Sequence, residues 1–490
     1  MKHSLTDRQR WLALYVLCTG VLMIVLDTTI VTVALPTIQA DLHFTGTSLV
    51  WVLNAYMLTF GGFLLLGGRL GDLYGQRKLF LLGLSLFTLA SLACGLAGSQ
   101  VTLVTARAVQ GLGGAVVTAV ALSLIMNLFT KPAERAQAMG IYGFVCAAGG
   151  SLGEVFGGFL TDAFGWESIF LVNLPIGVAV YAYCMQLLPR DTHAGGPRRL
   201  DVAGAVTVTL GLMLAVYAVV EGNTAGWASP QTLGLLALSV ILLALFLVIE
   251  ARTPEPLMPL RLFALRNLAT SNVVGVLWAA GMFAWFVITA LYLQHVLGYD
   301  PFRVGLAFLP ADLIMAAFSA GLSARMVIRF GIRGPLWLGL SIAAVGLLLF
   351  ARAPLDGAFV VDVLPGMLLL GLGAGMAFNP VLLAAMSDVD EHESGLASGV
   401  VNTSFMMGGA LGLAALASAA DARTAGLQRA GVEAVAALNG GYQFAFLLAA
   451  LITAAAAVLT ALLLQPRPPV AIAAHAAVVA ASEKGLADHA

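Results

Sequence analysis

Long apolar stretches separated by short polar breaks run along most of the 490-residue chain. A helix of about 18 or more mainly apolar residues is long enough to cross the hydrocarbon core of a bilayer. The pattern therefore predicts an all-α polytopic membrane protein with about 14 transmembrane helices. The expected spans are 11–35, 48–68, 79–98, 101–127, 136–160, 166–188, 200–221, 232–250, 268–296, 304–327, 335–352, 360–385, 397–418 and 441–464.

The composition supports a membrane protein. Hydrophobic residues make up 60% of the chain and charged residues 10%, whereas soluble domains carry about 25% charged residues. The breaks at 188–201 and 250–267 are polar and rich in Gly and Pro. In the tail, the apolar run 469–482 is too short for a span, and we expect an interfacial helix or disorder there.

The positions of Lys and Arg indicate the orientation, because an even number of spans places both chain ends on one side. If the N-terminus is cytoplasmic, 19 of the 24 Lys and Arg residues lie in cytoplasmic loops or tails. Only Arg303, Arg352, Arg423 and Arg429 fall on the other side, and Arg107 lies inside a span. We therefore expect both termini to be cytoplasmic, in a multi-pass protein of the cell inner (plasma) membrane.

The two halves of the chain contain an internal repeat. The segment "ERAQAMGIYGFVCAAGGSLG" at 134–153 matches "ESGLASGVVNTSFMMGGALG" at 393–412, at a constant offset of 259 residues. Parallel repeats of this kind are typical of secondary transporters, whose substrate site lies between the halves. The predicted units are an N-terminal six-helix bundle (11–188), two inserted helices (200–250), a C-terminal six-helix bundle (268–464) and a cytoplasmic tail (465–490).

Four short motifs follow one another along the first five spans. They are "LDTTIVTVALPTI" (26–38), "GGRLGDLYGQRK" (67–78), "RAVQGLGGA" (107–115) and "GGSLGEVFGG" (149–158). In this order they resemble the motifs of the major facilitator superfamily, in its fourteen-helix drug:proton antiporter branch. The resemblance covers 11–464 and implies a multidrug efflux transporter.

One position departs from the family pattern. The fifth-helix motif of these antiporters usually has proline where this chain has Glu154. The proline and the glycines of that motif are associated with export. Because Glu154 stands in place of the proline, the part of this association that depends on proline is weakened. By the same resemblance, the glycines Gly149, Gly153, Gly157 and Gly158 form a helix-packing motif.

Four ionisable residues are expected at a similar depth in the outer part of the membrane. With a rise of about 1.5 Å per residue, Asp27 and Arg107 lie about 10 Å and Asp312 about 12 Å from the outer face, and Glu154 lies in the outer third. Charges at membrane depth are tolerated when they pair, face water or are neutralised. We therefore interpret these four residues as candidates for proton coupling or substrate binding.

Two roles are open to Glu154. At helical spacing it shares a face with Gly150, Ser151, Gly157 and Gly158, so it points at a neighbouring helix rather than at lipid. It could exchange protons there. Alternatively it could be a structural strut, permanently protonated or paired with Arg107.

The segment after the second span forms, by resemblance, a conformational gate in a cytoplasmic loop. Its residues are Gly68, Arg69, Gly71, Asp72, Gly75 and Arg77. A further set of aromatic residues in the ninth span, Trp278, Trp285 and Phe286 with Met282, could line a pocket for a lipophilic cation or could simply pack.

The sequence favours a proton-coupled exporter of amphiphilic, preferably cationic, small molecules or drugs that works by alternating access. The alternatives are a proton-coupled uptake permease on the same fold and a non-transport membrane sensor or enzyme. We expect no enzyme activity, because the chain has no nucleophile–His pair, metal motif or phosphate-binding loop. The expected energy source is the proton motive force, with no cofactor, no metal and no nucleic acid, and the expected functional unit is a monomer in the lipid bilayer.

Overall fold

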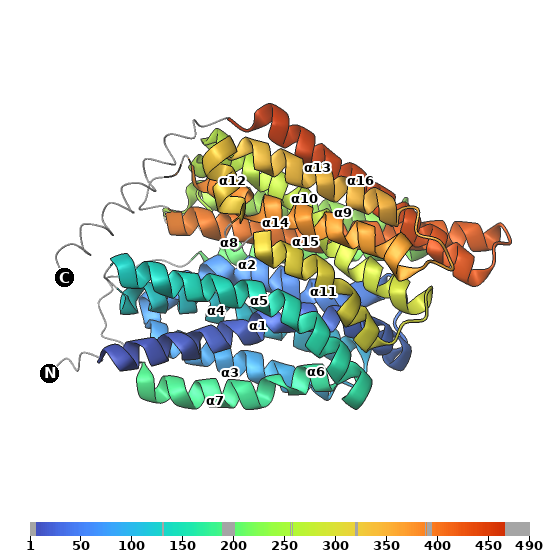
Figure 1. The fold of residues 1–490 in the computed structure, drawn as a ribbon. Coiled ribbons are helices and arrows are strands. Elements are labelled where there is room, and N and C mark those ends of the chain that lie inside the picture. The colour runs from blue at the N-terminus through green and yellow to red at the C-terminus, as the bar shows by residue number, and fades with distance from the viewer. Residues whose placement is uncertain are drawn as a thin grey trace.

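The computed structural model describes residues 6–129, 132–188, 201–254, 256, 258–318, 322–387, 389 and 394–465, and this part of the chain contains helices and no strand (Figure 1). The predicted tail beyond residue 465 and most of the break at 188–201 lie outside the described residues. The first-half helices are α1 (Asp7–Leu42), η1 (Ser48–Val50), α2 (Trp51–Tyr74), α3 (Gln76–Gly95), α4 (Gln100–Leu128), α5 (Pro132–Phe164), α6 (Ser168–Leu171) and α7 (Asn173–Leu187). They are followed by α8 (Val202–Ala225), α9 (Pro230–Arg252), η2 (Leu260–Ala264), α10 (Arg266–His295), α11 (Pro301–Ala317), α12 (Ser323–Phe330), α13 (Arg333–Phe350), η4 (Phe359–Val363), α14 (Leu364–Met386), α15 (Ser394–Arg429) and α16 (Ala434–Leu463).

The helices confirm the predicted all-α polytopic class. Within the described residues, 11 of them are long and apolar enough to cross a membrane. The other three expected spans coincide with α2, α5 and α11. The fourteen-span pattern of the sequence therefore matches the helices one by one, with α6 and α7 together forming the sixth span and α11 and α12 the tenth.

Local capping fixes where several spans begin. Thr6 and Gln9 form a reciprocal capping box at the start of α1, which satisfies backbone N–H groups that the first turn leaves unpaired. The side chain of Asp300 accepts a hydrogen bond from the backbone N–H of Arg303 at 2.8 Å, and Pro301 occupies the first position of α11. These caps place the helix ends in the polar breaks of the sequence.

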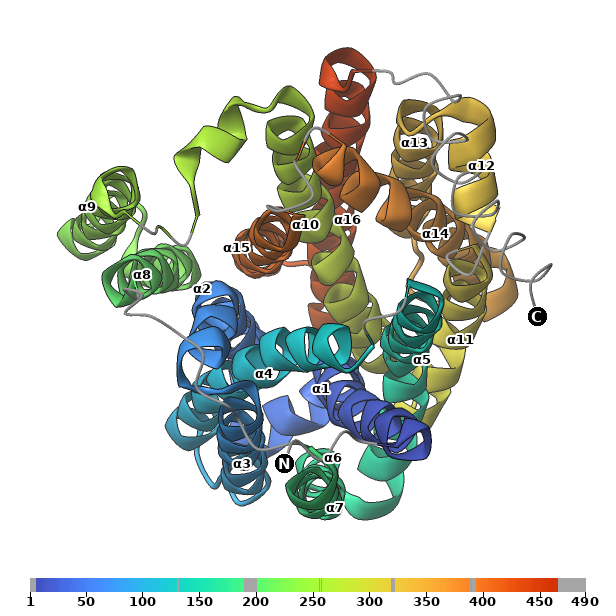
Figure 2. The ribbon, with the colours of Figure 1, turned by 90° about the vertical axis from the view of Figure 1, so that its left-hand side faces the viewer.

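The first and last described helices show that the chain begins and ends at the same end of the molecule, here called the terminus end (Figure 1). The opposite end, where α5 leads into α6 and α10 leads into α11, is called the far end. Figure 2 views the molecule from the terminus end. Odd-numbered spans therefore run from the terminus end to the far end and even-numbered spans run back.

Helices of the first half pack mainly on one another, and so do helices α10–α16. Figure 2 shows these two groups facing each other, with the α8–α9 pair at the edge beside α2 and α15. We call the groups the N-bundle (α1–α7) and the C-bundle (α10–α16). The largest contacts between them are two helix crossings, α5 with α11 and α2 with α15.

The structure differs from the expected loop after the second span. Helix α2 continues through Gly68 and Gly71 to Tyr74, and α3 starts at Gln76, so only Gly75 separates the two helices. Gly75 has φ +99°, a backbone conformation that residues with a Cβ rarely adopt. The predicted loop is therefore a helix end with a one-residue turn, because the polar residues of this segment can remain helical once they leave the membrane.

Candidate functional site

Asp27 on α1 and Arg107 on α4 form an ion pair inside the N-bundle. A terminal nitrogen of Arg107 lies 2.5 Å from the Oδ2 atom of Asp27, and both side chains are fully buried. Two charges without water are costly unless each is paired and hydrogen-bonded. The surroundings of the pair therefore decide whether it can exist in this apolar core.

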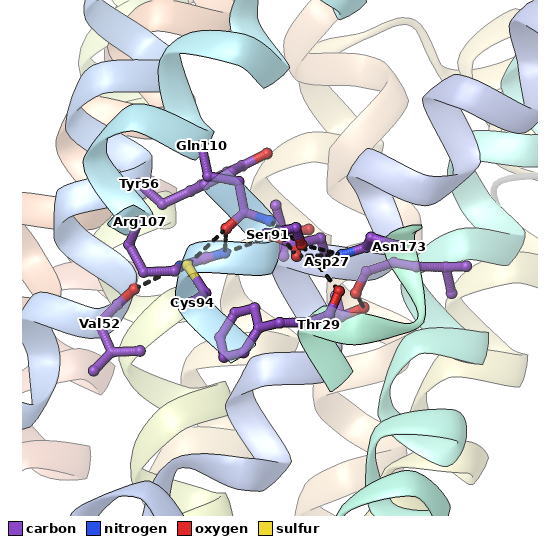
Figure 3. Close-up of polar contacts among 12 residues, drawn as sticks. Asp27, Thr29, Val52, Tyr56, Ser91, Cys94, Arg107, Gln110 and Asn173 are labelled. Atoms are coloured by element: carbon purple, nitrogen blue, oxygen red, sulfur yellow. Dashed lines mark hydrogen bonds and ion pairs between the residues drawn. The ribbon is translucent and has the colours of Figure 1, made fainter. Parts of the chain in front are cut away.

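Three further polar residues form a hydrogen-bond network with the carboxylate of Asp27 (Figure 3). The Oδ1 atom of Asp27 accepts hydrogen bonds from the side-chain amides of Gln110 (2.8 Å) and Asn173 (2.9 Å). Both amides also donate to the hydroxyl of Ser91, at 3.0 and 2.9 Å. The carboxylate therefore has three donors from α4 and α7, which compensates for the loss of water.

The guanidinium of Arg107 is held from several sides. It donates to the backbone carbonyl of Val52 (3.0 Å) and to the side-chain oxygen of Gln110 (2.7 Å). Its central carbon lies 4.4 Å from the ring centroid of Tyr56 and 5.6 Å from that of Phe170. Aromatic faces attract a cation, so the rings and the acceptors together fix the guanidinium in one place.

Glu154 on α5 and Asp312 on α11 form a different kind of pair, which joins the two bundles. Glu154 is 1% exposed and Asp312 is 3% exposed. The two carboxyl groups are close enough to interact electrostatically, but neither oxygen of Glu154 has the geometry of a hydrogen bond to any described residue. Two acids therefore face each other, with no Lys or Arg between them in the part of the chain that the structure describes.

The four ionisable residues thus separate into two pairs. The alternative in which Glu154 pairs with Arg107 is wrong, because Arg107 faces Asp27 across the inside of the N-bundle. The sequence predicted that all four residues lie at a similar depth in the membrane. The rotation of each helix about its axis, however, decides which of them are in contact. Asp27 and Arg107 belong to one bundle, whereas Glu154 and Asp312 come from two.

The glycines of the fifth-helix motif allow close helix packing. Gly149, Gly153 and Gly157 lie against α1, and a Cβ at Gly157 would stand 2.6 Å from the carbonyl oxygen of Ile30. Gly158 instead lies against α11, where a Cβ would stand 2.5 Å from the carbonyl oxygen of Pro301. Glycine lets two helix backbones approach at these positions, so α5 is wedged between α1 and α11.

The predicted gate residues lie at the terminus end of α2 and α3. Gly68 and Gly71 lie on the face of α2 toward α4, and a Cβ at Gly71 would stand 2.9 Å from the side chain of Val120. Arg77 donates to the backbone carbonyl of Met185 at 2.5 Å, which links α3 to α7. The side chains of Arg69 and Asp72 lie outside the part of the chain that the structure describes.

A cavity of about 510 Å³ lies between the bundles at the far end. Its walls are mainly apolar and come from α1, α10, α15 and α16, with Asp421, His295 and Tyr442 among the polar residues. Asp421 follows the expected end of its span at residue 418, so the hydropathy pattern did not mark it as a site residue. In the structure α15 continues as a helix to Arg429, which brings Asp421 to this cavity.

The aromatic residues of the ninth span are packed. Trp278 contacts the rings of Phe378 and Phe405, and Trp285 contacts those of Phe286 and Phe308. The space left beside Trp278 and Trp285 is about 10 Å³, which is at most room for one water molecule. In this conformation the stripe forms part of the core and does not line a pocket for a drug-sized molecule.

Sequence reasoning missed Gln110, Asn173 and Ser91, which complete the Asp27–Arg107 pair. Each is a polar residue within an apolar span, and buried polar side chains in membranes are expected to find partners. Gln110 lies three residues after Arg107 and so on the same helix face. That spacing was the signal that could have identified it.

Comparisons with known proteins agree with this geometry. A family model described as the Major Facilitator Superfamily matches residues 17–413. The puromycin resistance protein pur8 of Streptomyces alboniger is 39% identical over 90% of this chain and 89% of that protein. The cephamycin export protein CmcT of Amycolatopsis lactamdurans is 38% identical over 84% of this chain and 86% of that protein.

Solved structures show the same fold at low sequence identity. The POT family transporter PepTSo is similar with a TM-score of 0.68 at 17% identity, and the match covers 93% of this chain and 99% of that one. A bacterial homologue of the lysosomal transporter Spinster, in an inward-facing conformation, has a TM-score of 0.63 at 16% identity, covering 93% and 97%. The chain therefore belongs to the major facilitator superfamily, in the fourteen-helix branch that includes drug-resistance and antibiotic-export proteins.

Proposed function

We propose that this protein is a proton-coupled exporter that exchanges protons for amphiphilic, preferably cationic, small molecules by alternating access. The observation that carries the proposal is the buried, hydrogen-bonded Asp27–Arg107 pair. An ionisable pair at membrane depth is expensive and marks a transport or proton pathway by default. The similarity to a puromycin resistance protein and a cephamycin export protein supports the direction of transport.

In the proposed mechanism Asp27 is the principal proton site. Protonation would neutralise the carboxylate and remove its attraction for Arg107. The guanidinium would keep the carbonyl of Val52 and the oxygen of Gln110 as acceptors. Because α1 also packs against α5, α10 and α11, a small shift of α1 can reach the contact between the bundles.

Alternating access would move the bundles as rigid bodies about a central substrate site. The Asp27–Arg107 pair lies within one bundle, so this movement would leave the distance between its helices unchanged. We propose that the helix ends around Gly75 and Arg77 act as a latch at the terminus end. The far-end cavity, with the carboxyl of Asp421 in a mainly apolar wall, would suit an amphiphilic cation that is leaving the protein.

The proposed location is the cell inner (plasma) membrane, with both termini in the cytoplasm. The excess of Lys and Arg on the side of the termini supports this orientation, and the far end then faces outward. We further propose that the protein works as a monomer, without a cofactor or metal, and that the proton motive force drives it.

Transport in everted membrane vesicles tests this function. In everted vesicles an exporter carries its substrate inward, so a fluorescent lipophilic cation should accumulate when a proton gradient is imposed. Accumulation should stop when a protonophore removes the gradient, and it should be lost in Asp27→Asn. Asp162→Asn, which removes an exposed acid at the far end of α5, is the matched control and should transport normally.

The result that would contradict the proposal is wild-type protein that moves no cation against its gradient at any proton gradient. Efflux from the everted vesicles would instead favour the uptake permease.

A further inference from the structure

Helices α5 and α11 cross in backbone contact in the half of the bundles nearer the far end. A Cβ at Gly305 of α11 would stand 2.5 Å from the carbonyl oxygen of Glu154 and 3.1 Å from the Cα atom of Val155. One turn further along α5, a Cβ at Gly158 would stand 2.9 Å from the Cα atom of Phe302. Two glycines, one from each bundle, thus bring the bundles together here.

The acid pair lies directly beside this crossing. The backbone of Glu154 is itself part of the contact. Its carboxyl interacts with that of Asp312, which lies two helical turns after Gly305 along α11. Both side chains are more than nine-tenths buried. Both oxygens of Glu154 and the Oδ2 atom of Asp312 have no hydrogen-bond partner among the described residues.

The helices packed around the pair supply no compensating charge. Among the described residues, α6 and α14 carry no titratable group, and α1 and α4 contribute at this depth only Asp27 and Arg107, which face each other. The titratable groups of α10 and the other charged group of α11 stand at the helix ends; they are Arg266, Tyr292, His295 and Arg303. Nothing described between the bundles can therefore balance two negative charges.

Two carboxylates cannot both be charged in this place while the helices stay in contact. Repulsion between like charges is strong where water is excluded, and adjacent buried carboxyls share a proton for this reason. One added proton removes the repulsion and lets one carboxyl donate a hydrogen bond to the other. The closed crossing, in which α5 and α11 are in contact, therefore requires a bound proton. An open crossing, in which the two helices have moved apart, does not require one.

Among the described residues, an acid pair is found at the α5–α11 crossing and not at the α2–α15 crossing. The internal repeat relates α5 to α15 with an offset of 259 residues, which places Leu413 at the position of Glu154. Leu413 is fully buried in apolar surroundings. An acid is thus not needed for packing at this position of the repeat, which favours a chemical role for Glu154.

We propose that Glu154 and Asp312 form one proton-binding site that is shared by the two bundles and separate from Asp27. The bound proton holds the α5–α11 crossing closed, and its loss drives the crossing apart. This inference rests on the proposed function, since it assigns the site a step in proton-coupled export. In the proposed orientation, proton loading from outside lets the far end close, and deprotonation with substrate bound lets it reopen.

Hydrogen–deuterium exchange of the purified protein tests the proposal without any transport assay. The peptides that report on the crossing cover residues 152–164 and 300–312. After correction for the chemical pH dependence of exchange, wild type should be protected at about pH 6 and exchange faster at about pH 9. The open population should rise by about tenfold per pH unit while one proton is released.

The double variant Glu154→Gln/Asp312→Asn should show the same protection at both pH values, because its amide pair carries no charge. Glu154→Leu, which copies the residue at the equivalent position of the repeat, provides a second variant that also removes the paired charge. Asp162→Asn, on the same helix but exposed, should keep the wild-type pH dependence. The α13–α14 crossing at Gly339 and Gly373, which lies within one bundle, is the internal reference and should stay protected throughout.

Wild-type exchange that does not change between the two pH values would overturn the proposal, as would a double variant that keeps the wild-type dependence. Asp27→Asn separates this test from that of the proposed function. It should abolish gradient-driven transport but keep the pH-dependent exchange at 152–164. Loss of transport with retained exchange would contradict neither claim, whereas loss of both would show that the pair does not bind its proton independently.

Discussion

The two buried ionisable pairs differ in charge, in hydrogen bonding and in the bodies they connect. Asp27 and Arg107 are an acid and a base within the N-bundle, and the carboxylate accepts bonds from Arg107, Gln110 and Asn173. Glu154 and Asp312 are two acids in different bundles, and the oxygens of Glu154 have no hydrogen-bond partner among the described residues. The first pair has a nearly complete set of partners, whereas the second has no positive charge among the described residues to balance it.

This difference indicates how the same fold can use buried charge in two ways. Under the proposed alternating access, a compensated pair inside one bundle keeps its surroundings when the bundles move, so it responds mainly to protonation. An uncompensated pair between bundles changes its surroundings with every movement, so it links protonation to conformation directly.

Removing the base of the first pair should have the largest effect. Arg107→Met leaves the carboxylate of Asp27 buried with two amide donors and no cation. Breaking a buried ion pair by removing one partner costs about 3–5 kcal/mol, and we expect a loss of stability of this order in thermal unfolding in detergent. Arg423→Met, at an exposed position, is the control, and an unchanged unfolding midpoint in Arg107→Met would contradict the assignment.

A double-mutant cycle sharpens this prediction. Asp27→Asn/Arg107→Met removes both charges, so it should be less destabilised than the sum of the two single variants. If the losses of unfolding free energy in the two single variants simply added up in the double variant, the two residues would not interact.

The next largest effect is expected at the crossing beside the second pair. Gly305→Ala places a methyl group against the carbonyl oxygen of Glu154, and overpacking of this kind costs about 1–3 kcal/mol. Gly150→Ala is the matched control, because a Cβ there has no neighbour within 4 Å. Thermal unfolding should show loss of stability for the first variant only, and equal behaviour of the two would mean that α5 and α11 do not touch.

A smaller effect is expected when one donor to Asp27 is removed. Asn173→Ala takes away the hydrogen bonds to Asp27 and Ser91 but leaves Arg107 and Gln110 in place. A hydrogen bond to a charged group contributes about 1.5–3 kcal/mol at most, so the loss should stay below that of Arg107→Met. A larger loss than in Arg107→Met would show that the amide, and not the base, supports the carboxylate.

The smallest effect on stability is expected for Glu154→Gln. The oxygens of this side chain make no hydrogen bond to described residues, so the amide removes no partner and relieves repulsion. We expect the unfolding free energy to change by less than about 1 kcal/mol, in either direction. Destabilisation as large as in Arg107→Met would mean that Glu154 is a structural strut, which was the alternative raised by the sequence.

The sequence predicted the fold well because hydropathy reports directly on membrane insertion. The fourteen apolar stretches coincide with helices, and the repeat accounts for the paired crossings α5–α11 and α2–α15. Span ends were less accurate. Helix α15 continues to Arg429, beyond its predicted end, because a helix can extend into water where hydropathy no longer marks it.

The sequence identified the four ionisable residues of the site, but it did not predict which of them form pairs. Spacing placed Glu154 on one face with both Gly157 and Gly158, yet Gly157 meets α1 and Gly158 meets α11. These two glycines lie roughly 100° apart around the helix, so a single face cannot describe both. Which helices stand on either side of α5 is a property of the bundle, and the sequence of one helix does not contain it.

Proton movement caused by substrate tests the central claim most directly. The purified protein would be reconstituted into vesicles with a pH-sensitive dye inside, and a gradient of a lipophilic cation would be imposed without any proton gradient. We predict proton flow opposite to the cation in wild type and fewer protons per cation in Asp27→Asn, which keeps only the site at Glu154 and Asp312 and should still exchange labelled for unlabelled cation. Wild-type protein that moves the cation but no protons, or Asp27→Asn that moves protons as wild type does, would contradict the claim that Asp27 couples export to protons.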